Sequence, residues 1–203
     1  MNGPPADTDG TRAEREEQIL QAAERQFAEA GFYAVSMDAI ADEVGLSKQM
    51  VYNYVGSKES LYVACFRRAR VQLLGLLAGA AAGQTPGEQL LLGVNAFFKF
   101  VEEHREPWAL IHEHASQRGG PFAAEVNDMR TEIGRLISQL FVDAREAVGN
   151  DPSSVNTEVT AYAVLGAMES MAHWWKDHPE VPREELTREM VAVVWTGLER
   201  AVR

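Results

Sequence analysis

Residues 45–62 read GLSKQMVYNYVGSKESLY. The positions of glycine and serine in this stretch predict a short helix with a turn at each end. Ser47 is placed as the N-cap of a helix over residues 48–54, and Gly56 ends it. The preceding residues 37–44 form a second short helix, with Ser36 as its N-cap and Gly45 after its last residue. Two short helices joined by a glycine-containing turn predict a helix-turn-helix unit.

The apolar residues of these two helices occur where crossed helices need them. Ile40, Ala41 and Val44 share one side of the first helix, and Leu46 and Val51 follow in the turn and in the second helix. The remaining side chains of residues 48–54 are mostly polar and are expected to face outward. A helix supported in this way has the diameter to enter the major groove of B-DNA.

Candidate contacts to DNA follow from the chemistry of the side chains in this region. Serine caps and helix N-termini offer donors to phosphate, and lysines add charge. Carboxamides four residues apart can each pair with adenine, and tyrosines offer a hydroxyl to phosphate and a ring face to thymine methyl groups. The predicted DNA-binding residues are Ser36, Ser47, Lys48, Gln49, Tyr52, Asn53, Tyr54 and Lys58.

Charge is distributed unevenly along the 203 residues, whose formal net charge is -11. Residues 1–70 contain 8 Lys/Arg and 11 Asp/Glu, whereas residues 71–203 contain 11 and 19. Residues 45–58 contain two lysines and no acidic residue. A local basic patch can bind phosphate although the whole chain is acidic.

The chain as a whole predicts an all-α fold of about nine helices, because no segment alternates with the period of a strand. We expect a disordered Gly/Pro/Asp-rich tail at residues 1–11, a helix-turn-helix domain at 12–56 and a helical domain at 57–203. Ser153 or Ser154 is expected to cap the eighth helix, and Pro107 and Trp108 to begin the sixth. No apolar run is long enough to span a bilayer, and Cys65 is the only cysteine, which favours a reduced, cytoplasmic setting.

Residues 18–62, QILQAAERQFAEAGFYAVSMDAIADEVGLSKQMVYNYVGSKESLY, resemble the N-terminal domain of tetracycline-repressor-like (TetR family) transcriptional regulators. The resemblance implies a homodimer whose larger C-terminal region binds a small effector that changes the spacing of the DNA-reading heads. It also assigns DNA contacts to the same eight residues. Val55 stands where an aromatic residue is common, and Asn53-Tyr54 replaces pairs containing histidine, so the resemblance does not transfer a base preference.

The C-terminal part contains more bulky apolar residues than one narrow core stripe needs, which suggests an adaptable pocket for a lipophilic acyl-chain or aromatic effector. Each of these residues is also compatible with an ordinary core position. His112 could supply a polar anchor, or be a satisfied core histidine. The predicted ligand-binding residues are Phe97, Trp108, His112, Met129, Ile133, Met168, Met171 and Trp175.

Two strips suggest how a dimer could form. Ala163, Gly166, Ala167 and Ser170 form a small-residue strip in the eighth helix, and the ninth offers Val191, Val194, Trp195 and Leu198. Pairing of these helices with their symmetry mates and packing inside one subunit are both consistent with the pattern.

Other functional classes find less support in the sequence. The histidines lack the partners and spacing of a metal site, no catalytic motif is present, and no cofactor is expected. A helical adaptor that binds protein through its apolar strips would not need Tyr52 or Lys58. The sequence therefore predicts a ligand-responsive repressor that binds an inverted-repeat operator as a homodimer, with an activator or a ligand-independent DNA-binding regulator as alternatives.

Overall fold

The computed structural model describes residues 11–115, 122–147, 149–151, 153 and 156–202, and their side chains except those of 112–115 and 197–202. These residues form nine α-helices and one 3-10 helix, without a strand, so the all-α prediction is confirmed. The elements are α1 Arg12–Ala34, α2 Met37–Val44, α3 Lys48–Val55, α4 Lys58–Ala78, η1 Gly79–Ala82, α5 Pro86–Glu103, α6 Arg105–Ala115, α7 Ala123–Ala147, α8 Thr157–Lys176 and α9 Arg183–Val202.

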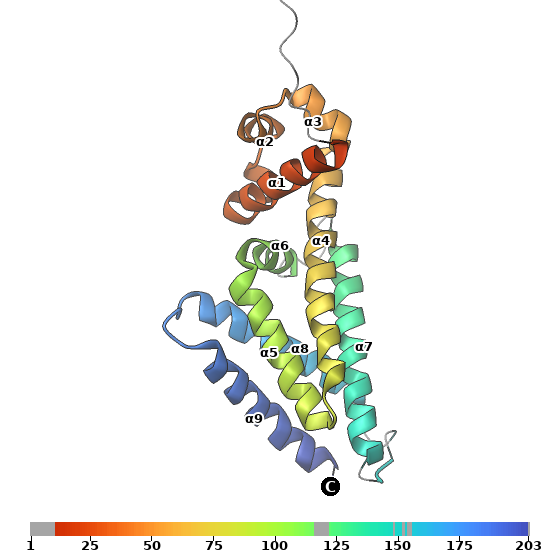
Figure 1. Cartoon of the computed structure of the whole chain (residues 1–203). Coiled ribbons are helices and arrows are strands. Elements are labelled where there is room, and N and C mark those ends of the chain that lie inside the picture. The colour runs from red at the N-terminus through yellow and green to blue at the C-terminus, as the bar shows by residue number, and fades with distance from the viewer. Residues whose placement is uncertain (1–10, 116–121, 148, 152, 154–155, 203) are drawn as a thin grey trace, which may run out of the picture. The chain divides into compact units, whose positions relative to one another are not determined.

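The helices belong to two compact units, Met1–Phe66 and Arg67–Arg203, and the division falls within α4. In the first unit, α1, α2 and α3 gather around the beginning of α4 (Figure 1). Its core contains Ile19, Ala23 and Phe27 from one face of α1, all fully buried. The ring of Tyr62 from α4 meets the ring of Phe27 edge-on at 5.0 Å between centroids. Burial of these apolar side chains is the main favourable contribution to folding of the unit.

Side-chain caps define where the short helices begin. Ser36 Oγ accepts the backbone N–H of Ala39 at 3.1 Å, and Ser47 Oγ accepts that of Met50 at 3.3 Å. Both predicted N-caps are therefore present. Gly45, at the end of α2, has φ +68°, a left-handed conformation in which a side chain is strained. Gly45 begins the turn of residues 45–47 between the two helices.

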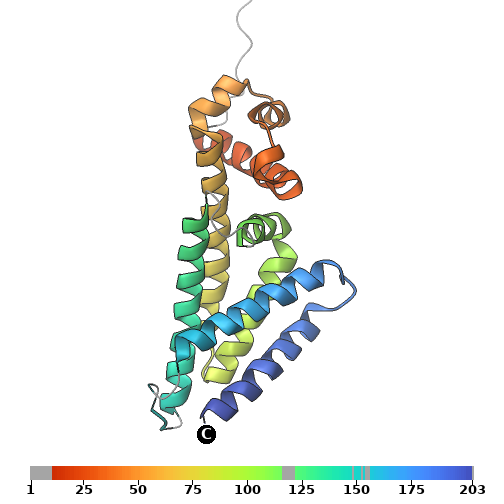
Figure 2. The same ribbon diagram turned by 180° about the vertical axis from the view of Figure 1, so that it is seen from behind.

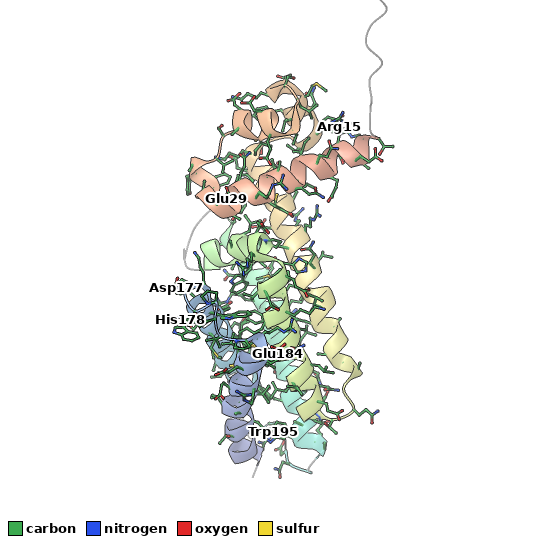
Figure 3. The ribbon with its side chains drawn as sticks, turned by 60° about the vertical axis from the view of Figure 1, so that its left-hand side comes forward. Arg15, Glu29, Asp177, His178, Glu184 and Trp195 are labelled. Atoms are coloured by element: carbon green, nitrogen blue, oxygen red, sulfur yellow. The ribbon has the colours of Figure 1, made fainter. Side chains whose placement is uncertain are left out.

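In the second unit, α5 packs along α9, and α7 packs along α8 (Figures 1 and 2). Arg183, at the start of α9, donates to a carboxylate oxygen of Glu102 on α5 at 2.9 Å. Toward the other end of α9, Trp195 (labelled in Figure 3) lies against Gly87 of α5. A Cβ atom at position 87 would stand 3.1 Å from the indole, so glycine permits this close approach.

Two helix starts differ from the prediction. Asn156 caps α8 by accepting the N–H of Val159 at 3.1 Å, so the expected cap at Ser153 or Ser154 was wrong. Ser153 instead donates its hydroxyl to the Asp151 carboxylate at 2.7 Å, and Ser154 lies outside the described residues. Helix α6 begins at Arg105, two residues before Pro107. Proline is compatible with this position because the first N–H groups of a helix have no intrahelical partner.

Replacement of Gly45 by alanine should destabilise the protein by about 1–2 kcal/mol, the cost of a left-handed backbone for a residue with a Cβ. Gly75→Ala is the matched control. A Cβ at either position would meet nothing within 4 Å, but of these two glycines only Gly45 has a positive φ. Gly75 lies within α4, near its C-terminal end, and alanine there should stabilise by about 0.5–1 kcal/mol. Urea unfolding followed by circular dichroism measures both changes, and a loss of equal size in the two variants would contradict the prediction.

Candidate nucleic-acid interface

Helix α3 is oriented by a single buried residue. Val51 is fully buried, whereas Gln49 and Asn53, two residues before and after it, are exposed. Because successive helical residues are about 100° apart, residues at i±2 point away from the buried side. The two carboxamides therefore lie on the solvent side of α3, as predicted. Tyr52 and Tyr54 are half-buried along its flanks.

Lys48, the first residue of α3, is bound to Asp38 in the first turn of α2. Its Nζ lies 2.7 Å from Asp38 Oδ2, and both side chains are largely exposed. The hydrogen bond to Asp38 and the charge of that carboxylate raise the pKa of Lys48 above its usual value. The ammonium is therefore fully charged at neutral pH and has an intramolecular partner in the free protein.

Gln49 and Asn53 are linked to each other. Gln49 Nε2 donates to Asn53 Oδ1 at 3.2 Å, across one turn of α3. The Gln49 carbonyl oxygen and the Asn53 amide group are not used by this bond. A base edge that approaches α3 thus meets an acceptor and a donor whose positions depend on each other.

Two further cations lie over aromatic rings beside α3. The Arg12 guanidinium, at the start of α1, is 5.4 Å from the ring centroid of Tyr54, and it also donates to Glu16 at 2.8 Å. Lys58 Nζ, at the start of α4, is 4.6 Å from the centroid of Phe32. Cation–π contacts of this kind position a charge without neutralising it. Lys58 therefore remains able to attract phosphate, whereas the charge of Arg12 is also balanced by Glu16.

The predicted DNA-binding residues all occur in one short part of the first unit, from the N-cap of α2 to the first turn of α4. Three neighbouring side chains were not predicted as part of this surface. Met50 exposes 43% of its area on α3, Arg12 reaches Tyr54, and Asp38 binds Lys48. The sequence showed Asp38 only as a carboxylate in the first turn of α2, and nothing in it indicated that α1 begins beside α3.

The structure brings some of the predicted ligand-binding residues together. The rings of Phe97 on α5 and Trp108 on α6 meet edge-on at 5.3 Å, and Phe98 lies 6.1 Å from Trp175 of α8. Met129, Ile133 and Met168 are buried, and Met171 is half-buried. The side chain of His112 lies outside the described residues. Trp174, another bulky residue of α8, is 46% exposed and stacks on His178.

One ion pair joins the helices that contribute these methionines. Arg130 of α7 lies 3.1 Å from Glu169 of α8, and little of either side chain is exposed. Desolvation raises the pKa of Glu169, and the positive charge of Arg130 partly offsets that increase. Each member of this ion pair directly follows one of the methionines in the sequence, Arg130 after Met129 and Glu169 after Met168. Among the residues whose side chains are described, no group of three potential metal ligands is found, and no described helix is long and apolar enough to cross a membrane.

Comparison with known protein families identifies both units. A family model described as "Tetracyclin repressor-like, C-terminal domain" matches residues 86–197. A second, "Bacterial regulatory proteins, tetR family", matches residues 19–65. The chain belongs to the TetR family. The members of this family are non-enzymatic DNA-binding regulators of transcription, so the predicted class of the protein is confirmed.

Relatives of this TetR-family protein are similar over most of their length. The transcriptional activator FasR of Mycolicibacterium smegmatis is 27% identical over 92% of this chain and 84% of its own. The crystal structure of a TetR-like regulator from Rhodococcus sp. RHA1 is 32% identical, with a TM-score of 0.81 over 94% of this chain and 99% of that one. The regulator FadR of Bacillus subtilis in complex with stearoyl-CoA shares the fold, with a TM-score of 0.77 at 14% identity over 88% of this chain and 96% of that one.

Asn53→Ala should lose base discrimination at one position of each half-site, because it removes a carboxamide from the exposed side of α3. Lys58→Ala is the contrasting variant. It should weaken binding to all duplexes alike and reduce the slope of log K against log salt by about one. Competition binding with a set of single-base operator variants at several salt concentrations separates the two effects. If Asn53→Ala lowered the affinity for every duplex by the same factor, a role in direct readout would be wrong.

Proposed function

We propose that this TetR-family regulator binds an inverted-repeat operator as a homodimer and is released from it by a lipophilic effector bound in the C-terminal unit. The observation that supports this most directly is the orientation of α3, whose buried Val51 leaves Gln49 and Asn53 on the exposed side. In the proposal, the α3 helices of two subunits enter successive major grooves about 34–36 Å apart. In the proposal, as in the prediction from the sequence, DNA binding is assigned to residues 12–56 and effector binding and dimerisation to residues 57–203, and the protein acts in the cytoplasm.

Within each half-site, the proposed contacts divide by chemistry. Lys48, Lys58 and the N-termini capped by Ser36 and Ser47 bind phosphates and supply affinity that depends on salt. Gln49 and Asn53 read adenine edges, and the tyrosines of α3 contact phosphate and thymine methyl groups. The exposure of Lys48, Gln49 and Asn53 on α3 supports the assignment.

For the effector we propose an acyl-CoA whose acyl chain is held by the predicted ligand-binding residues. The paired rings of Phe97 and Trp108, together with the buried Met129, Ile133 and Met168, provide an apolar and adaptable environment. The structure of Bacillus subtilis FadR with stearoyl-CoA shows such a ligand in a protein of the same fold. In the proposal, Met171 borders the same site, Trp175 closes it, and His112 keeps its predicted role as a polar anchor.

The sign of regulation has two candidates. Repression is our proposal, because a regulator bound across a promoter blocks the polymerase unless the effector removes it. Activation is the second candidate, since the Mycolicibacterium smegmatis relative is named an activator. In vitro transcription from a promoter that carries the selected operator distinguishes them, because added protein lowers transcript yield in one case and raises it in the other.

A long-chain acyl-CoA should dissociate the protein from an operator that has been selected from a random pool, whereas free CoA should not. Trp108→Ala should raise the effector concentration needed by about tenfold, which corresponds to roughly 1.4 kcal/mol of lost aromatic contact. Operator affinity without effector should stay unchanged in this variant. Gel-shift titrations, with thermal shifts as a second readout, measure both quantities. Stabilisation by strongly polar metabolites alone would overturn the lipophilic assignment.

For the dimer we propose that the exposed face of α8 meets its symmetry mate, with α9 beside it. Ala163 and Ser170 of the small-residue strip are exposed, and a Cβ at Gly166 would meet nothing within 4 Å. The strip on α9 is divided, because Val194 is buried within the subunit and Trp195 lies against Gly87, while the side chain of Leu198 is outside the described residues. Val193 is a large apolar residue that α9 exposes.

Ala163→Glu should convert the dimer to a monomer at micromolar concentration, since it places a charge at a site of close helix approach. Val71→Glu is the matched control, because Val71 is also an exposed apolar residue but belongs to α4 and not to α8. Sedimentation equilibrium measures the mass of both variants. A dimer of unchanged affinity in Ala163→Glu would show that this face of α8 is not the interface.

A further inference from the structure

The first unit is rich in acidic residues and its cations are paired. Residues 11–66 contain five Lys/Arg and nine Asp/Glu. Each cation contacts another side chain of the same unit. The contacts are Arg12 with Glu16 and Tyr54, Arg15 with Gln18, Arg25 with Glu43, Lys48 with Asp38, and Lys58 with Phe32. A DNA-binding unit with this charge balance has little surplus attraction for phosphate.

Among these contacts, that of Lys48 with Asp38 is the one whose cation belongs to α3. Ser36 caps α2 two residues before Asp38, and Ser47 caps α3 immediately before Lys48, so the first turns of both helices meet at this ion pair. The proposed phosphate sites are the same two N-termini. A phosphate that approaches Lys48 therefore meets a carboxylate 2.7 Å from the ammonium that would bind it.

We propose that Asp38 is a specificity-determining residue. It lowers the affinity for arbitrary duplexes by holding Lys48 in an ion pair and by repelling phosphate. The proposal rests on the assignment of α3 as the helix that faces DNA. On an arbitrary duplex the unit docks loosely, and no base contact compensates for separation of Lys48 from Asp38. On the operator, contacts of Gln49 and Asn53 with bases bring the backbone close, and Lys48 transfers to a phosphate. The repulsion between Asp38 and phosphate therefore lowers the affinity for arbitrary duplexes more than the affinity for the operator.

The alternative is that Asp38 has only a structural role, through the helix dipole of α2 and the bridge to α3. A structural role predicts that loss of the carboxylate lowers stability and weakens binding to every duplex. The proposal predicts the opposite sign for arbitrary duplexes. The two interpretations are therefore separable by one variant.

The experiment measures binding of the full chain to a random-sequence duplex and to the operator selected from a random pool, by fluorescence anisotropy over a series of salt concentrations. The variants are Asp38→Asn, Lys48→Met, the double variant, and Glu29→Gln as a matched control. Glu29 is exposed on α1, at the opposite end from Arg15 (Figure 3), and its replacement removes one negative charge from the same unit.

Asp38→Asn should bind the random duplex about threefold more tightly, the effect of one added phosphate contact, and steepen its salt slope by about one. Operator affinity should change less, so that the ratio of operator to random binding falls. The change should be clearly smaller in the Lys48→Met background, because there Asp38→Asn relieves only the direct repulsion of phosphate. Glu29→Gln should leave both affinities within error of the original protein.

Four results would overturn the proposal. Equal gains for Asp38→Asn and Glu29→Gln would mean that net charge alone matters, and weaker binding to both duplexes by Asp38→Asn, with a lower unfolding midpoint, would mean a structural role. If Lys48→Met weakened operator binding while Asp38→Asn changed nothing, this inference would fail and the proposed phosphate contact would stand. If Lys48→Met itself had no effect on either duplex, the phosphate contact and the inference would fail together.

Discussion

Burial of Val51 under α1 and α2 determines which side of α3 meets solvent. α3 is short, and a helix of this length gains too little from its own backbone hydrogen bonds to be stable alone. Its orientation therefore depends on this apolar contact and on the Ser47 cap. A rotation of α3 by two residues would bury Gln49 or Asn53 and expose Val51. The polar surface assigned to DNA is in this sense a consequence of the core.

The same surface shows how an acidic protein can bind a polyanion. Lys48, Lys58 and Arg12 keep their charge while each lies against a side chain of its own unit. Exposed pairs of this kind contribute little to stability, so exchange of Asp38 for a phosphate costs little in folding free energy. The affinity for a duplex then depends on how many of these side-chain partners its phosphates can replace at the same time. Base contacts are therefore favoured over charge as the source of selectivity.

Much of the fold was predictable because local signals and tertiary packing agree. The serine caps, Gly45 and Gly56 gave α2 and α3 within a residue of their observed ends, and the burial of Ile19, Ala23 and Phe27 follows their spacing. Where several capping residues occur together, as before α8, the sequence did not distinguish Asn156 from the serines before it. The exposure of Trp174 and the pairs formed by Asp38 and Arg12 depend on neighbours distant in the chain, which single-sequence patterns do not contain. The side-chain contacts assigned to DNA and to the effector remain predictions.

The contact between Gly87 and Trp195 has a consequence for the evolution of the C-terminal unit. Because the indole occupies the volume that a methyl group at position 87 would need, the two positions are not free to drift independently. Lineages that gain alanine at position 87 should carry a smaller side chain than tryptophan at position 195. Otherwise α5 and α9 must shift along each other. Paired substitution at these two sites would thus record how the register between α5 and α9 has been kept.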